Sequence, residues 1–205
     1  MNMYADRDAP RTFGDAAPYP DVRVITLRED QVRLGLWIFL ATATMLFAAF
    51  TSAYIVRRSG SDWRAVALPP RLWLNTLVLL ASSLALEAAN RLGARGRWVA
   101  ATGAFGAALA GGVAFLAGQI AACRELVDAG VYLQSNPYSS FFYMLTGAHA
   151  VHVVAALAVL AWGFAATCSG ARDPRAWTAH MGNCRTFWHF LGGVWLWLFA
   201  LVTFL

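Results

Sequence analysis

The sequence predicts an all-α fold: a polytopic integral membrane bundle of five transmembrane helices with a cytoplasmic N-terminus. Hydrophobic residues make up 59% of the 205 residues and charged residues 13%, whereas a soluble domain has about 45–50% apolar and about 25% charged residues. The apolar residues also fall into five runs, each close to the roughly 20 residues that a helix needs to cross a bilayer core. Both observations argue against a soluble globular fold.

Polar or helix-breaking residues mark the ends of these runs, which predict spans over residues 32–56, 72–89, 98–122, 139–167 and 186–205. Arg57 and Arg58 close the first span, because placing a guanidinium group in hydrocarbon costs about 3 kcal/mol. Pro69 and Pro70 precede the second span, where a proline ring would remove an amide donor from a continuing helix.

The last three spans are distinguished by their small residues and by the residues at their ends. The third carries Gly103, Ala107 and Gly111 four residues apart on one face, a spacing that lets membrane helices approach closely. Simple helix packing is the favoured interpretation. The fourth span is entered through Asn136 and Pro137, and the fifth runs to the last residue, so no further domain is expected after it.

The segment 1–30 is polar and contains prolines, so it is predicted to be a tail that precedes a single membrane domain over 31–205. It lacks the basic and then apolar start of a signal peptide. With the N-terminus inside, eleven of the 16 basic residues, all arginine, lie on the cytoplasmic side. This distribution predicts an N-in, C-out orientation, although the first outer loop carries four arginines.

Composition and motifs exclude several classes of protein. The arginines flank apolar runs rather than gather on one face, so no nucleic-acid partner is expected. Cys123, Cys168 and Cys184 share no CxxC spacing, which argues against a zinc site or a disulfide framework. The sequence contains no Walker loop, no HExxH and no nucleophile elbow.

Glu87 is the one carboxylate inside a predicted span, and intramembrane charge is usually functional. It lies four residues before Arg91, at the spacing of a helical ion pair. A pair or a lipid-headgroup contact at the helix end is the favoured interpretation. A role in proton transfer or at a subunit interface is the alternative.

His149 and His152 lie three residues apart, on one face of the fourth span, a spacing that two ligands of one metal can adopt. No third ligand is obvious, because neither His180 nor His189 is accompanied by carboxylates within the membrane. Interhelical hydrogen bonding is therefore the favoured role of these imidazoles.

A long motif runs through the fourth span and comprises Phe141, Phe142, Thr146, Gly147, His149, Ala150, His152 and Val153. It closely resembles the signature helix of subunit III of the haem-copper oxidases, the cytochrome c oxidase subunit III family. The departure within it is Ala150, where the family usually has glycine. A second match, at Trp188, His189, Phe190 and Trp195, resembles the family's terminal segment.

Further segments agree in order, and the resemblance covers nearly the whole chain after the tail. Five spans resemble the short bacterial form of the family, which lacks the first two helices of longer members. Two family carboxylates are absent: Ala43 stands at the position of an intramembrane Glu, and Gly192 at that of an Asp. A proton-linked role of that Glu cannot be carried over to this chain.

The resemblance implies a non-catalytic subunit III of a respiratory oxidase that reduces oxygen to water and pumps protons. It implies no cofactor in this chain, haem and copper in partner subunits, and bound phospholipid. The partners expected are oxidase subunit I directly, subunit II, membrane phospholipids and, in some assemblies, a respiratory supercomplex. The implied roles are to stabilise the catalytic subunit, hold structural lipids and support proton uptake, in a bacterial inner membrane.

Candidate contact residues follow from this role. Arg57, Arg58 and Arg91 are predicted to bind phosphate headgroups or to fix topology. Aromatic residues of the last span are predicted to offer surface to lipid tails, and these are Trp188, Trp195, Trp197 and Phe199. Glu87, His149, His152 and His189 complete the candidate lipid or subunit contacts.

Three other interpretations stay open. The chain could serve a quinol oxidase or a nitric oxide reductase as the equivalent subunit. It could be a small transporter, although neither inverted repeats nor a broken helix is visible. It could also be a membrane haem enzyme that uses His149 and His189.

Overall fold

The computed structural model describes residues 22–168 and 174–205, and these residues form five long helices and no strand. The helices are α1 (Val22–Arg58), α2 (Arg71–Ala94), α3 (Trp98–Asp128), α4 (Pro137–Cys168) and α5 (Pro174–Phe204). Each contains a stretch long and apolar enough to cross a membrane. The five-helix bundle predicted from the sequence is therefore confirmed.

The helices are longer than the predicted spans. Residues 1–21 of the expected tail lie outside the described part, whereas residues 22–30 belong to α1. The apolar pattern locates the hydrocarbon-crossing part of a helix, but arginine and glutamate are themselves good helix formers. A charged residue can therefore end a membrane span without ending the helix.

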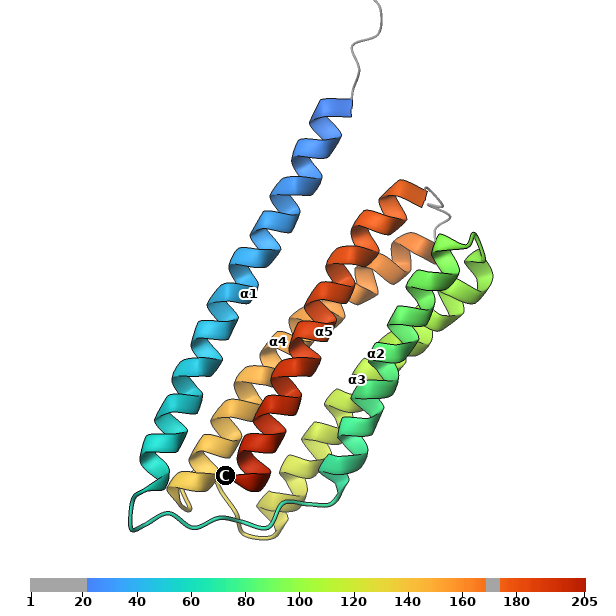
Figure 1. Cartoon of the computed structure of the whole chain (residues 1–205). Coiled ribbons are helices and arrows are strands. Elements are labelled where there is room, and N and C mark those ends of the chain that lie inside the picture. The colour runs from blue at the N-terminus through green and yellow to red at the C-terminus, as the bar shows by residue number, and fades with distance from the viewer. Residues whose placement is uncertain (1–21, 169–173) are drawn as a thin grey trace, which may run out of the picture.

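Figure 1 shows how the helices are arranged. Helices α2 and α3 form a hairpin with the most extensive contact in the bundle, and α5 packs against both α2 and α4. Gly96 occupies the short turn of this hairpin with φ of 70°, a backbone conformation that glycine adopts at little cost. Within the described residues α1 contacts only α4 and α5, and its N-terminal part extends away from the others.

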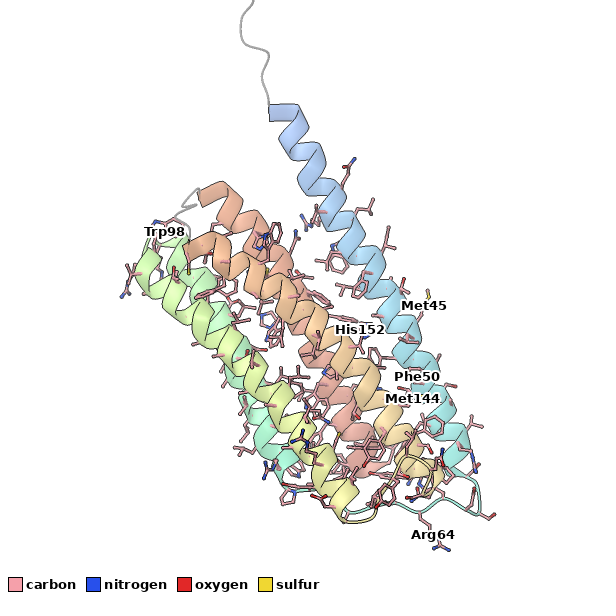
Figure 2. All side chains as sticks on the ribbon, turned by 180° about the vertical axis from the view of Figure 1, so that it is seen from behind. Met45, Phe50, Arg64, Trp98, Met144 and His152 are labelled. Atoms are coloured by element: carbon pink, nitrogen blue, oxygen red, sulfur yellow. The ribbon has the colours of Figure 1, made fainter. Side chains whose placement is uncertain are left out.

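The outward-facing surface of the bundle is apolar. Met45, labelled in Figure 2, points away from the other helices and is 74% exposed. Large exposed side chains on the other helices include Leu74, Val99 and Trp162. Such a surface would be unfavourable in water and suits lipid tails. The interior is filled instead by aromatic rings and by small residues that admit them.

Close contact between α2 and α3 depends on glycines that face α2. A Cβ atom at Gly111 would lie 2.9 Å from Cβ of Ser82, and the Ser82 hydroxyl donates a 2.7 Å hydrogen bond to the Ala108 carbonyl on α3. Gly103 has no neighbour within 4 Å of such a Cβ, and Ala107 is exposed. Of the predicted small-residue face, only Gly111 serves this contact.

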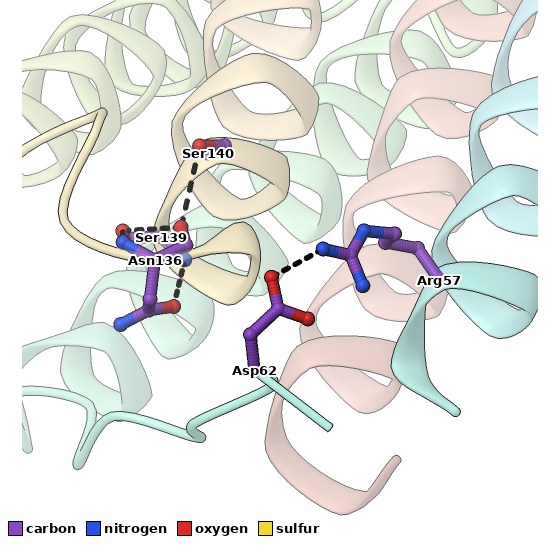
Figure 3. A network of polar contacts seen from close by, with 5 residues as sticks. All are labelled: Arg57, Asp62, Asn136, Ser139 and Ser140. Carbon is purple, nitrogen blue, oxygen red and sulfur yellow. Dashed lines mark hydrogen bonds and ion pairs between the residues drawn. The ribbon is translucent and has the colours of Figure 1, made fainter. Parts of the chain in front are cut away.

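Helix α4 begins at Pro137, two residues before the predicted start of the fourth span at residue 139. Its N-cap Asn136 accepts a 3.0 Å hydrogen bond from the Ser139 amide through its side chain, and the Ser139 hydroxyl accepts one of 3.2 Å from the Asn136 amide. Figure 3 shows this reciprocal arrangement, which satisfies two amides that a helix end otherwise leaves free. Pro137 follows at the first helical position, where its missing N–H is not needed.

Replacing Gly111 with leucine should push α2 and α3 apart, because the new side chain meets Ser82. Overpacking of this kind costs about 1–3 kcal/mol, so the apparent melting temperature of the chain in detergent should fall. Gly103→Leu is the matched control, on the same helix but in open space, and should leave the melting temperature unchanged. Equal effects of the two substitutions would contradict the packing described here.

Candidate functional site

His149 lies at the junction of four helices. Its side chain, on α4, is 1% exposed. Its ring lies 6.4 Å from that of Phe47 on α1, 6.1 Å from Phe115 on α3 and 5.4 Å from Trp195 on α5, measured between centroids. Within the described residues neither ring nitrogen has a hydrogen-bond partner. The imidazole is thus enclosed by aromatic rings from three neighbouring helices.

His152 faces α1. Its Nδ1 donates a 2.7 Å hydrogen bond to the Ala148 carbonyl of its own helix, and its ring lies 5.7 Å from that of Phe39 and 5.4 Å from that of Phe47. Figure 2 labels it between α4 and α1. The expected interhelical hydrogen bonds of His149 and His152 are therefore wrong. The two residues connect α4 to its neighbours through packing contacts between rings and not through hydrogen bonds between helices.

The tryptophans of α5 divide into buried and outward-facing ones. Trp188 and Trp195 are 1% and 2% exposed, so the prediction that they face lipid tails is wrong, and it is also wrong for Phe199 at 6%. Trp197 is 57% exposed and keeps that role. The reason is helical position, since Trp188 and Trp195 are seven residues apart and lie on the same, inward face.

Each buried tryptophan has a specific neighbour. The Trp195 indole N–H donates a 3.0 Å hydrogen bond to the Thr76 hydroxyl and so joins α5 to α2. The Trp188 ring lies over Gly112 of α3, where a Cβ atom would be 2.5 Å from the ring. Because residue 112 is glycine, the Trp188 indole ring fits between the helices.

The carboxylate of Glu87, on α2, connects this helix to α5. It accepts a 3.0 Å contact from Arg91, as the four-residue spacing predicts, and a 2.8 Å contact from Arg185 on α5. No sequence pattern pointed to Arg185, because a spacing rule finds only partners on the same helix. The ion pair between Arg71 and Glu125 similarly joins α2 to α3, at 2.7 Å.

The arginines after α1 have different surroundings. Arg57 forms an ion pair with Asp62 in the following loop, at 2.5 Å (Figure 3), and its hydrogen bond holds the pKa of that carboxyl below the ordinary value. The pair therefore favours the folded loop at neutral pH and weakens as the pH falls and Asp62 becomes protonated. Arg58 is exposed.

The positions of the two missing carboxylates lie within the bundle. Ala43 is 2% exposed, and a Cβ atom at Gly192 would lie 3.8 Å from the Ser83 hydroxyl. Apolar residues at both positions leave no buried charge that needs a partner. Among the residues that the structure describes, no three His, Cys, Asp or Glu side chains gather as metal ligands would.

Two grooves open on the sides of the bundle. The groove between α1 and α5, about 720 Å³, contains His189 together with Phe47, Thr51 and Trp197. His189 is exposed there, whereas His149 is in the interior, so the two histidines have different surroundings. The second groove, about 420 Å³, lies between α3 and α4.

Comparison with known proteins identifies the chain's relatives. The family described as cytochrome c oxidase subunit III matches residues 24–205. The chain belongs to the cytochrome c oxidase subunit III family. It is accordingly a subunit III of a haem-copper oxidase, a component of an oxidase complex. The resemblance seen in the sequence motifs is thereby confirmed.

Relatives of this subunit III cover most of its length. It is 30% identical over 193 residues to the probable cytochrome c oxidase subunit 3 of Mycobacterium leprae, covering 87% of this chain and 90% of the relative. It is 32% identical over 189 residues to that of Nocardia farcinica, covering 86% and 89%. The cytochrome c oxidase subunit 3 of Thermostichus vulcanus is 28% identical over 198 residues, covering 91% and 89%.

Replacing His149 and His152 together with alanine should loosen the oxidase complex without changing its haem spectrum. The double variant leaves a cavity where four helices meet, and truncation of a buried ring costs about 3 kcal/mol or more. His149→Phe keeps a ring of similar shape and should retain most of the thermal stability. A change in haem absorption in either variant would contradict a packing role.

Replacing Arg185 with glutamine should destabilise subunit III by about 1–2 kcal/mol, because Glu87 loses its interhelical partner in a partly buried position. Arg91→Gln is the matched control, since it removes the other partner of the same carboxylate. The Arg91 side chain is 70% exposed, so that loss should stay below about 0.5 kcal/mol. Thermal unfolding of both variants measures the difference, and an equal or reversed order would contradict it.

Proposed function

We propose that this subunit III is non-catalytic by itself and supports a partner that holds the haem and copper. The observation that supports this proposal is the packing around His149, whose imidazole is 1% exposed and is surrounded by aromatic rings. A side chain enclosed in this way stabilises helix packing. The complex as a whole would reduce oxygen to water and move protons.

The expected partners are oxidase subunit I, in direct contact, and subunit II. The apolar outer surface supports both protein and lipid contacts within the bilayer, and the grooves beside α1 and between α3 and α4 are lined largely by apolar side chains that suit acyl chains. Through these contacts the subunit would stabilise the catalytic subunit during turnover, hold structural phospholipid and support proton uptake from the cytoplasmic side.

The same proposal includes the location and orientation. The relatives are bacterial proteins, which supports a bacterial inner membrane, and the excess of arginine at the N-terminal side supports N-in and C-out. The ion pair of Glu87 with Arg91 and Arg185 would then lie near the cytoplasmic surface, and that of Arg57 with Asp62 near the opposite surface.

Purification of the tagged chain from its native membrane in mild detergent tests the assignment. We expect copper-containing subunits I and II to copurify and the visible redox spectrum to show haem a. Haem b with quinol oxidase or nitric oxide reductase subunits would instead move the chain to a sibling complex. A colourless chain without partners would overturn the proposed function and favour a transporter.

A further inference from the structure

The groove between α3 and α4 combines apolar walls with a polar end. Its lining residues on α3 include Leu116 and Ile120, and α4 contributes Gly147 and Ala150. Gln119 lies between these two α3 residues in the sequence, and toward the C-terminal end of α3 the lining includes the charged side chains of Arg124 and Asp128. At about 420 Å³, the groove is within the range of small-molecule binding sites.

Gln119 lines this groove and carries a buried hydrogen-bond donor that is unpaired among the described residues. Its side chain is 4% exposed, although it lines the groove. Its Oε1 accepts a 3.3 Å hydrogen bond from the Asn75 amide on α2, whereas its Nε2 has no partner within the described residues. A buried donor without a partner carries a desolvation penalty. An occupant of the groove that presents an acceptor oxygen at this depth would remove that penalty.

The charged end of the groove carries one residue of each sign. Arg124 and Asp128 are exposed and one helical turn apart, and neither belongs to the four ion pairs found among the described residues. Glu125, between them, is already paired with Arg71. Arg124 is five residues beyond Gln119, which is about 7.5 Å along the helix axis. The groove thus presents a cation and an anion at its mouth and a neutral donor deeper inside.

We propose that the α3–α4 groove binds one ethanolamine phospholipid. The phosphodiester would lie on Arg124, the ammonium would donate to Asp128, and an ester carbonyl would accept from Nε2 of Gln119, with an acyl chain along Leu116 and Ile120. This inference rests on the proposed lipid-holding role and adds the site and the lipid class.

The charge pattern selects that class among membrane lipids. A lipid whose headgroup carries only negative charge would place it beside the Asp128 carboxylate as well as beside Arg124. A choline headgroup has the required charges, but its quaternary ammonium has no N–H to donate. A free fatty acid supplies one carboxylate and leaves either Gln119 or Arg124 without an acceptor.

The test is lipid binding to the purified oxidase complex, delipidated and then titrated with phosphatidylethanolamine, phosphatidylcholine or phosphatidylglycerol and measured by native mass spectrometry. We expect the ethanolamine lipid to bind most tightly at one site. Arg124→Gln and Asp128→Asn should each weaken it about tenfold, the effect of losing one hydrogen bond to a charged group. Arg64→Gln, an exposed arginine outside this groove, is the control and should bind as the wild type does.

A second measurement locates the bound lipid on the complex. A phosphatidylethanolamine with a photoreactive acyl chain should label α3 and α4 peptides around Ile120 and Ala150 in the wild-type complex. Unchanged affinity in both groove variants, a preference for another headgroup, or cross-linking of Ala150→Cys to a partner subunit in place of lipid labelling would overturn the inference. An intact, haem-containing complex in those experiments would leave the proposed function standing.

Discussion

The hydrophobic effect does not drive helices to associate within a bilayer, because lipid tails are as apolar as leucine. Every backbone polar group must also be satisfied within a helix, so the five long helices follow from composition, whereas their association must come from close packing and a few polar contacts. This subunit meets that constraint with aromatic rings seated on small residues. Trp188 over Gly112 is the clearest instance, and Ser82 against Gly111 is a close contact between two small residues.

The polar contacts between helices are few and specific. Asn75 with Gln119 and Ser82 with Ala108 join α2 to α3, and Trp195 with Thr76 joins α5 to α2. At the helix ends, where water and headgroups are near, ion pairs replace neutral hydrogen bonds. The gradient from rings in the middle to charges at the ends matches the polarity of the bilayer itself.

Helix α1 is attached differently from the other four. It contacts α4 and α5 through Phe39 and Phe47, which meet the rings of His149, His152 and Phe187. The conspicuous histidines of the family motif therefore hold the most separate helix onto the bundle. The spacing of the motif histidines is compatible with metal ligation, whereas in the structure both rings pack against α1.

Composition and apolar run length determined the fold class, the number of helices and their approximate positions, because a bilayer imposes a minimum length that the sequence displays directly. A local rule also determined the Glu87–Arg91 pair, since the two residues lie about one turn apart on the same helix. Only the tertiary structure decided that Arg185 shares Glu87, that Trp188 and Trp195 face inward, and that His149 lies among aromatic rings. Apolar residues surround every side of these helices in the sequence, so periodicity could not separate a face that meets lipid from a face that meets another helix.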